Sequence, residues 1–307
     1  MEIIYVPYAA INKGKWDACI NSALHPCLYV TSIYADAMAG KWDALILGDY
    51  QTVMPLYARK KAGIKYLCQP AFLPHGGIFS ASPITIKTTE AFIGKALEIF
   101  NFADIGLAYP VQVGHTFKHM RVQERNNFVV HLALPYPEIR GRYAPGFTKS
   151  LNRLKKLSLQ YMASEDIKEV TDLFKSLYLD KIAGLENADV KKMAALCKAM
   201  QVNNNTIIRK AYSSDKELLC AVILLKYRDR LYNMISCITT AGKKAEANYF
   251  LYDKIMEEFS GKGMALDLEG SDIKGVADFY RKMSPENEPS CSIRYNNLPP
   301  LLKLFKK

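Results

Sequence analysis

The sequence predicts an α+β fold (α/β by some schemes) built of two similar domains in tandem. With 307 residues, of which 50% are hydrophobic and 23% charged, the chain can bury sizeable cores and suits one large or two medium domains. The order strand, two helices, three strands, helix, strand occurs twice, although the halves share no clear sequence repeat. We therefore expect each domain to contain a mixed, mainly antiparallel sheet flanked by helices.

The first half contains the complete series of elements. Apolar residues in alternation predict strands, and apolar residues at helical spacing predict helices. The expected elements are a strand at 2–6, helices at 13–22 and 32–40, three strands within 42–70, a helix at 88–100, a strand at 103–110, and a hairpin of 119–124 with 128–134.

The connection between the halves is expected in the segment LPYPEIRGRYAPGF, residues 134–147. Three prolines and two glycines are typical of a linker rather than of an element interior. We place the boundary near Gly146, which gives domains of residues 1–146 and 147–307.

The second half repeats the series with clearer patterns. The expected elements are a strand at 159–162, helices at 166–180 and 189–202, strands at 206–212, 218–226 and 231–238, a helix from 248 to 259, a strand from 264, and a helix at 276–283. Asn248 is a good residue to cap the helix, and Gly261 should follow its end.

Two carboxylates end the strand that begins at residue 264. Its apolar residues alternate with Asp267 and Glu269, so a period-two strand would place both carboxylates on one face. In a sheet flanked by helices, ligands gather beyond the carboxyl ends of strands. The alternative explanation of this pair is a solvated strand end.

The stretch from Leu231 to Met283, which ends in the helix VADFYRKM, resembles the second half of a GNAT-type acyltransferase. That family often carries a Phe-Tyr pair in its late helix. The segment LDLEGSDIKGVADFY is more similar to the Fem-type branch, tandem GNAT-like proteins that include aminoacyl-tRNA-dependent peptidoglycan aminoacyltransferases. The loop TTAGKKAEAN departs from the usual Arg/Gln-x-x-Gly-x-Gly/Ala phosphate signature, and no coiled-coil arm is inserted.

The resemblance implies transfer of an acyl or aminoacyl group from an acyl-CoA or an aminoacyl-tRNA to an amine acceptor. Such a reaction needs a base for the amine, donors for the carbonyl oxygen and an acid for the leaving group. Asp267 or Glu269 is expected to act as the base. Tyr280, which matches the family's helix tyrosine, is expected to be the acid, with packing as its alternative role. The oxyanion donor should be a main-chain amide near 237–239.

The net charge of +11 favours an anionic partner, and basic residues cluster after the expected linker. The segment TKSLNRLKKL contains Lys149, Arg153 and Lys156 and has no acidic residue. The resemblance implies that such a basic helix lies beside the cleft between the domains. A solvated basic face is the alternative. The expected binding residues in this half are Lys149, Arg153, Lys156, Gly242, Lys243 and Asn248.

In the first half, the loop QPAFLPHGGIFS lies between the third strand of the meander and the next helix. In a GNAT domain, phosphate is held at this position. Gly76 and Gly77 are expected to turn backbone amides toward an anion, with His75 as donor or base. A simple tight turn is the alternative.

Several classes of site and compartment are not expected. The seven cysteines form no Cys-x-x-Cys pair and are odd in number, which argues against zinc and disulfides. His115 and His119 are four apart but have no third ligand, so we expect no metal. No nucleophile elbow, P-loop or dinucleotide fingerprint occurs. The start of the chain does not resemble a signal peptide, and the longest apolar run, 218–225, is too short for a membrane span. We expect a cytoplasmic protein with no tightly bound cofactor.

A second hypothesis is a non-catalytic tandem module that binds RNA or a phosphorylated ligand through a basic interdomain surface. If a working site exists, we expect it in the second domain, opening toward the interdomain cleft. The oligomeric state is left open.

Overall fold

The computed structural model describes residues 2–61, 63–113, 117–270 and 273–299, which form two compact units. Unit 1 comprises Met1–Arg125 and Pro289–Lys307, and unit 2 comprises Asn126–Glu288. The division therefore falls well before Gly146, and the end of the chain returns to unit 1. The amino-acid composition of the last residues does not indicate that they belong to unit 1.

The expected linker is helical. Residues 134–147 contain α4 (Tyr136–Gly141) and the start of α5 (Pro145–Leu154). Both helices carry a proline in the first turn. Proline is tolerated there because the first N–H groups of a helix have no intrahelical partner. The prolines therefore begin helices in unit 2.

Unit 1 follows the expected order, with a fourth strand in the meander and two further strands at Phe79–Ser80 and Ser290–Asn296. Its elements are β1 (Ile3–Val6), α1 (Lys13–Ser22), α2 (Ser32–Ala39), β2 (Asp43–Leu47), β3 (Thr52–Leu56), β4 (Ala58–Lys61), β5 (Ile64–Cys68), β6 (Phe79–Ser80), α3 (Ile86–Ile99), β7 (Phe102–Leu107), β8 (Met120–Arg125) and β16 (Ser290–Asn296). They form a sheet of order β1-β2-β3-β6 and a second of order β4-β5-β7-β16-β8. The core includes Leu45, Leu56 and Phe92.

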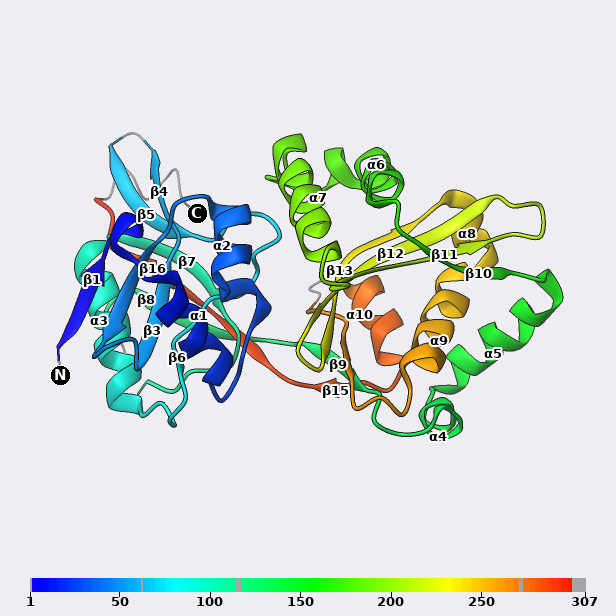
Figure 1. Cartoon of the computed structure of the whole chain (residues 1–307), viewed down its shortest axis with the longest axis horizontal. Helices are drawn as coiled ribbons and strands as arrows, with labels where there is room; N and C mark the ends of the chain where they lie inside the picture. Colours follow the sequence, from blue (N-terminus) through cyan, green and yellow to red (C-terminus); the bar gives the residue numbers. More distant parts are fainter. Residues whose placement is uncertain (1, 62, 114–116, 271–272, 300–307) are drawn as a thin grey trace. The chain divides into compact units, whose positions relative to one another are not determined.

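Unit 2 is built on one sheet of order β10-β11-β12-β13-β14-β9-β15 (Figure 1). Besides α4 and α5, its elements are β9 (Phe128–His131), β10 (Gln160–Ser164), α6 (Ile167–Tyr178), α7 (Asn187–Gln201), β11 (Thr206–Tyr212), β12 (Leu218–Tyr227), β13 (Arg230–Ile238), α8 (Thr240–Ala245), α9 (Ala247–Phe259), β14 (Ala265–Asp267), α10 (Lys274–Arg281) and β15 (Glu286–Asn287). Residues of α5, α9 and α10 pack on one face, where Phe147, Tyr252 and Leu266 join the core. Helix α6 contacts β12 and β13, and the thiol of Cys237 on β13 donates to the Val170 carbonyl of α6.

Polar side chains begin several helices, as local sequence predicts. Asn12, Thr85, Asp166 and Thr239 each accept a hydrogen bond from a backbone N–H of the first turn. Asn248 has no such role, because α8 occupies most of the expected loop and α9 already begins at Ala247. A capping residue type alone did not locate this helix start.

The expected hairpin of residues 119–124 with 128–134 is wrong. Both strands exist, but β8 pairs with β16 in unit 1, whereas β9 pairs with β14 and β15 in unit 2. The short interval between β8 and β9 is a crossing between units rather than a hairpin turn. The fold class itself is confirmed: both units are mixed and mainly antiparallel, with parallel pairs β5–β7 and β13–β14.

A first prediction concerns the packing of α8 on the sheet. A Cβ at Gly242 would lie 2.1 Å from the Leu219 carbonyl oxygen, whereas a Cβ at Gly275 would meet no atom within 4 Å. Gly242→Ala should therefore lower the free energy of unfolding by about 2 kcal/mol, and Gly275→Ala should not lower it. Denaturant unfolding measures both; equal effects would contradict the close approach of α8 to β12.

Candidate active site in unit 2

Strands β13 and β14 separate in the middle of the sheet of unit 2. They run in parallel only as far as the pair Tyr232 and Asp267, where β14 ends. Strand β13 continues to Ile238 and stays paired with β12 on its other side. In the part of the chain that the structure describes, no strand pairs with residues 233–238 on the side that β14 has left. This unpaired edge exposes backbone groups that a ligand can use.

A β-bulge places two polar side chains of β13 on the same face. Ile235 pairs with Ile223, and Asn233 pairs with Leu224, so Met234 is an extra residue. In a regular strand, Asn233 and Ser236 would face opposite sides, because side chains alternate. The bulge brings both to the face that α9 and α10 cover.

Four side chains, Asn233, Ser236, Tyr252 and Tyr280, form what we call the hydroxyl cluster. The Asn233 amide donates to the Tyr280 hydroxyl oxygen at 3.3 Å, and the Tyr252 hydroxyl donates to the Ser236 hydroxyl at 3.2 Å. Tyr252 is 1% exposed and Tyr280 8%, whereas Ser236 is exposed. The cluster therefore runs from the surface into the interior.

Both tyrosines of the hydroxyl cluster keep their protons at neutral pH. Burial raises the pKa of Tyr252 to about 12 and the pKa of Tyr280 well above its ordinary value. The nearby charge of Glu269 contributes to the shift of Tyr280. These hydroxyls are therefore neutral hydrogen-bond donors at pH 7 and cannot act as bases.

The two carboxylates of the expected acidic pair do not share a strand face. Strand β14 ends at Asp267, whose carboxylate accepts a hydrogen bond from the Glu269 N–H at 3.0 Å. This Asx-type turn puts Glu269 in the left-handed region, at φ 64°. Leu266 and Leu268 pack in the core with Tyr280, so the intervening Asp267 faces the opposite side of the sheet.

Asp267 is held by several partners on that opposite side. Its carboxylate accepts from Arg230 at 2.7 Å and from the Asn127 amide at 3.4 Å. Burial raises the pKa of Asp267, while Arg230 and the other donors act in the opposite direction. Burial lowers the pKa of Arg230, but Asp267, Glu288 and Tyr232 together outweigh this effect and the guanidinium stays charged. Asp267 therefore fixes the turn that carries Glu269 and is not open to a substrate amine.

The amides expected to stabilise an oxyanion are only partly available. The N–H of Thr239 donates to the Leu219 carbonyl at 2.9 Å and so belongs to the sheet. The N–H of Ile238 donates to the Tyr178 hydroxyl at 3.4 Å, a long bond at the unpaired edge. Alternation of backbone groups along the strand directs the N–H of Ser236 to the same edge.

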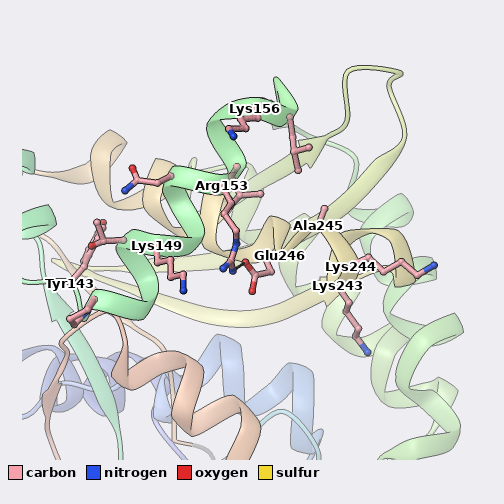
Figure 2. Close-up of a pocket in the computed structure, with 13 residues that line it drawn as sticks. Tyr143, Lys149, Arg153, Lys156, Lys243, Lys244, Ala245 and Glu246 are labelled. Carbon is pink, nitrogen blue, oxygen red and sulfur yellow. Dashed lines mark hydrogen bonds and ion pairs between the residues drawn. The ribbon is translucent and has the colours of Figure 1, made fainter.

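A basic pocket of about 1240 Å³ lies between α5, the short 3-10 helix Lys155–Leu157 and α8. Figure 2 shows its charged side chains. The lining includes five basic side chains and one acidic side chain: Lys149, Arg153, Lys156, Lys243, Lys244 and Glu246. The structure thus brings together two segments, around 149–156 and around 243, that are far apart in the sequence.

Glu246 lines the basic pocket and holds one of its basic side chains in place. It stands between α8 and α9 at φ 57° and pairs with Arg153. Burial raises the pKa of Glu246, but hydrogen bonds from Arg153 and Ser150 outweigh this effect and lower it. Glu246 therefore stays ionised and fixes the Arg153 guanidinium, whereas Lys149 and Lys243 are exposed and can be reached by a ligand.

The basic pocket and the hydroxyl cluster are connected through α9. Glu246 lines the pocket directly before α9, and Tyr252 belongs to the cluster. Six residues separate them, which is about 9 Å along a helix axis. Tyr249 and Tyr252 both contact the Phe279 ring, with centroids 5.0 and 5.6 Å away, so they lie on one face of α9.

In unit 1, Gly76 and Gly77 lie against neighbouring parts of the fold and do not form the anion-binding loop expected near His75. The N–H of Gly76 donates to the Gly106 carbonyl at 2.8 Å, so it is not directed toward an anion. Gly77 has φ 138°, a conformation that favours glycine. Burial lowers the pKa of His75 to about 4, so its ring is neutral at pH 7.

Among the described residues, no group of three His, Cys, Asp or Glu side chains is placed to hold a metal ion. His115 lies outside the described residues. The described helices include none long and apolar enough to cross a membrane.

Sequence reasoning missed Asn233, Ser236 and Tyr252. The signal for the two β13 residues was present, because polar residues three apart in the run LYNMISCI break the period of two and indicate a bulge. Tyr252 gave no signal, since it fits the apolar face of α9 equally well.

No protein-family model matches the sequence, and no curated protein shows a significant sequence match. Solved structures do match along the chain. FemX matches with a TM-score of 0.67 and 13% identity over 100% of each chain. The C-terminal domain of a protein described as a lysylphosphatidylglycerol synthetase from Agrobacterium fabrum matches with a TM-score of 0.59 and 9% identity over 96% of this chain and 95% of that chain.

A tandem GNAT protein from the clavulanic acid biosynthesis pathway matches with a TM-score of 0.52 and 11% identity, over 97% of this chain and 99% of that chain. At these identities the likeness concerns the fold. The chain has a tandem GNAT-like fold of the Fem type.

A second prediction tests the role of Asp267. Asp267→Asn keeps the size of the side chain but leaves Arg230 with Glu288, a half-buried carboxylate, as its remaining anionic partner, so the free energy of unfolding should fall by about 2 kcal/mol. The control is Asp278→Asn, whose partners Lys274 and Arg281 are exposed, and it should change stability little. Chemical denaturation that finds the two variants equally stable would contradict a buried ion pair.

Proposed function

We propose, from the tandem GNAT-like fold and the site in unit 2, that this chain is an acyltransferase. It moves an acyl or aminoacyl group from an activated, phosphate-bearing donor to an amine. The observation that carries the proposal is that a basic pocket lies at the N-terminal end of α9 and that Tyr252 of the hydroxyl cluster lies about 9 Å farther along the same helix.

The basic pocket suits the phosphates of the donor. Five basic side chains surround one ion-paired glutamate, so the pocket keeps a positive balance. Acyl-CoA and aminoacyl-tRNA both place phosphates at a distance from a reactive carbonyl, and both are donors that this pocket can accept. These donors occur in the cytoplasm, which is the proposed location, and no tightly bound cofactor is needed.

The carbonyl of the donor is proposed to lie at the unpaired edge of β13. Backbone N–H groups fixed in a strand can stabilise the negative charge that develops on the carbonyl oxygen without reorganisation. The N–H groups of Ser236 and Ile238 point to this edge, and the long hydrogen bond from Ile238 to Tyr178 is readily exchanged for a stronger one.

Glu269 is proposed to accept the proton of the attacking amine, and Tyr280 is proposed to donate a proton to the leaving atom. The amine nitrogen attacks the carbonyl carbon and gives a proton to Glu269. The bond from carbon to the leaving oxygen or sulfur breaks, and the Tyr280 hydroxyl donates its proton to the leaving atom. Tyr280 then regains a proton through Tyr252, with which it shares a hydrogen bond, and through the exposed Ser236 hydroxyl. Asp267 acts indirectly, by holding the turn of Glu269.

The direct test is a transfer assay with two donors, an acyl-CoA and an aminoacyl-tRNA, and a panel of primary amines. Release of free thiol or of deacylated tRNA reports the reaction. Turnover with either donor supports the proposal and identifies the donor class. Tight binding of RNA without turnover of either donor would instead favour a non-catalytic module.

A third prediction concerns Tyr280. Tyr280→Phe removes the proposed acid and should lower kcat by roughly 100-fold with KM nearly unchanged, while the free energy of unfolding falls by about 1 kcal/mol because the buried Asn233 amide loses its acceptor. Tyr136→Phe is the matched control, because its hydroxyl donates to Asp253 at 2.8 Å, outside the hydroxyl cluster. Full turnover by Tyr280→Phe would remove this residue from the mechanism.

A fourth prediction concerns the basic pocket. Removing Lys149 and Lys243 together should weaken donor binding and reduce its dependence on salt, by roughly 0.7 in the log–log slope for each lost phosphate contact. The control is the pair Lys191 and Lys198 on α7, which line a different groove. An unchanged salt slope for the Lys149 and Lys243 variant would place the donor phosphates elsewhere.

A further inference from the structure

Each unit contains the same strand, helix, strand arrangement with a parallel pair. In unit 1 the pair is β5 and β7, joined through α3, with Leu67 opposite Ala103 and Cys68 opposite Asp104. In unit 2 the pair is β13 and β14, joined through α9. In unit 1 β5 ends at Cys68 and β7 continues to Leu107, whereas in unit 2 β14 ends at Asp267 and β13 continues to Ile238. Each unit therefore has a slot where one strand of the pair continues beyond the end of the other.

In unit 1, the chain itself fills this slot. Directly after β5, the Gln69 side chain donates to the Gly106 carbonyl at 2.7 Å and accepts from the Gly106 N–H at 2.5 Å. The amide of Gln69 thus forms the same two bonds that a strand residue would form with β7. The Gln69 side chain therefore closes the slot directly after β5, where its amide takes the place of a backbone peptide group.

Farther along β7, Gly76 takes the place of a strand. Its N–H donates to the Gly106 carbonyl at 2.8 Å, and its carbonyl accepts from the Ala108 N–H at 2.9 Å. Gly76 forms a parallel bridge with Leu107. The backbone groups of β7 that border the slot are therefore used by residues 69–77, which we call the plug.

The plug is tightly packed. A Cβ at Gly106 would lie 2.2 Å from the Pro74 carbonyl oxygen, so no side chain fits between them. His75 is half-buried, with its ring centroid 5.6 Å from that of Tyr29. No space remains beside Gly106 for a second extended chain.

The slot of unit 2 differs in this respect. Among the described residues of unit 2, no strand or glycine segment pairs with β13 beyond Tyr232 on the β14 side. Ser236 on that edge is exposed. Two units of like topology thus have one filled slot and one open slot.

We infer that unit 1 carries a closed copy of the donor slot, sealed by the plug of residues 69–77, so that the chain binds one donor and binds it in unit 2. This inference rests on the proposed function for the donor itself. The closure of the slot rests on the hydrogen bonds of unit 1 alone. The two can therefore fail separately.

Hydrogen exchange of the free protein tests the closure without any ligand. The amides of Gly76, Gly106 and Ala108 should exchange roughly 100-fold more slowly than in an unstructured peptide, or slower still, because each donates to a fixed acceptor. Exchange of these three amides at the rate of an exposed loop would overturn the inference.

Gly106→Ala provides a second readout. The added methyl group must displace Pro74, so the protection of Gly76 and Ala108 should fall by at least roughly tenfold. Gly94→Ala is the control in the same unit, because its Cβ would meet only the Phe117 ring at 3.6 Å, an ordinary contact. Unchanged protection in Gly106→Ala would show that Pro74 does not close the slot.

Native mass spectrometry with coenzyme A, and separately with a minihelix RNA, counts the donor sites. We expect one equivalent per chain, lost when Lys149 and Lys243 are replaced by Ala. Two equivalents per chain would overturn the inference and leave the proposed function standing. Absence of binding by both probes would count against the proposed function, and the exchange rates would still decide whether the slot is closed.

Discussion

The separation of β13 from β14 beyond Tyr232 and Asp267 is the constraint on which the site depends. Asp267 ends β14 by accepting the Glu269 N–H, and Arg230 holds Asp267 in place. Since β14 stops there, β13 continues with one unpaired edge. The bulge at Met234 then directs Asn233 and Ser236 to the face of α9 and α10. Without this bulge, Asn233 and Ser236 would lie on opposite faces of β13, and the hydroxyl cluster could not form.

The order of elements could be predicted because it depends on local patterns. Apolar spacing indicated α1 and α7 closely, and the run of basic residues at 149–156 indicated one wall of the pocket. Long-range pairing could not be predicted in this way. Strand β16 lies at the far end of the chain yet pairs with β7 and β8, and no local signal distinguishes it from a strand of unit 2.

The candidate site was predictable in residue type more than in geometry. Tyr280 and Glu269 emerged from a resemblance and a strand pattern, and the structure places them within electrostatic influence of each other. The same pattern put Asp267 on their face, which fails because an Asx turn ends the alternation at that residue. The glycines at 76 and 77 looked like an anion loop, but Gly76 completes a sheet. Glycine permits both uses, and only tertiary contacts distinguish them.

In the proposed reaction, transfer takes place in unit 2, and the donor's phosphates and carbonyl are bound beside α9. A crystal structure of the chain with a stable donor analogue, such as a CoA thioether, tests this most directly. The account predicts phosphate density between Lys149 and Lys243, and the thioether within hydrogen-bonding distance of the Tyr280 hydroxyl. Phosphates bound in unit 1, or an acyl group far from Tyr280 and the edge of β13, would contradict it.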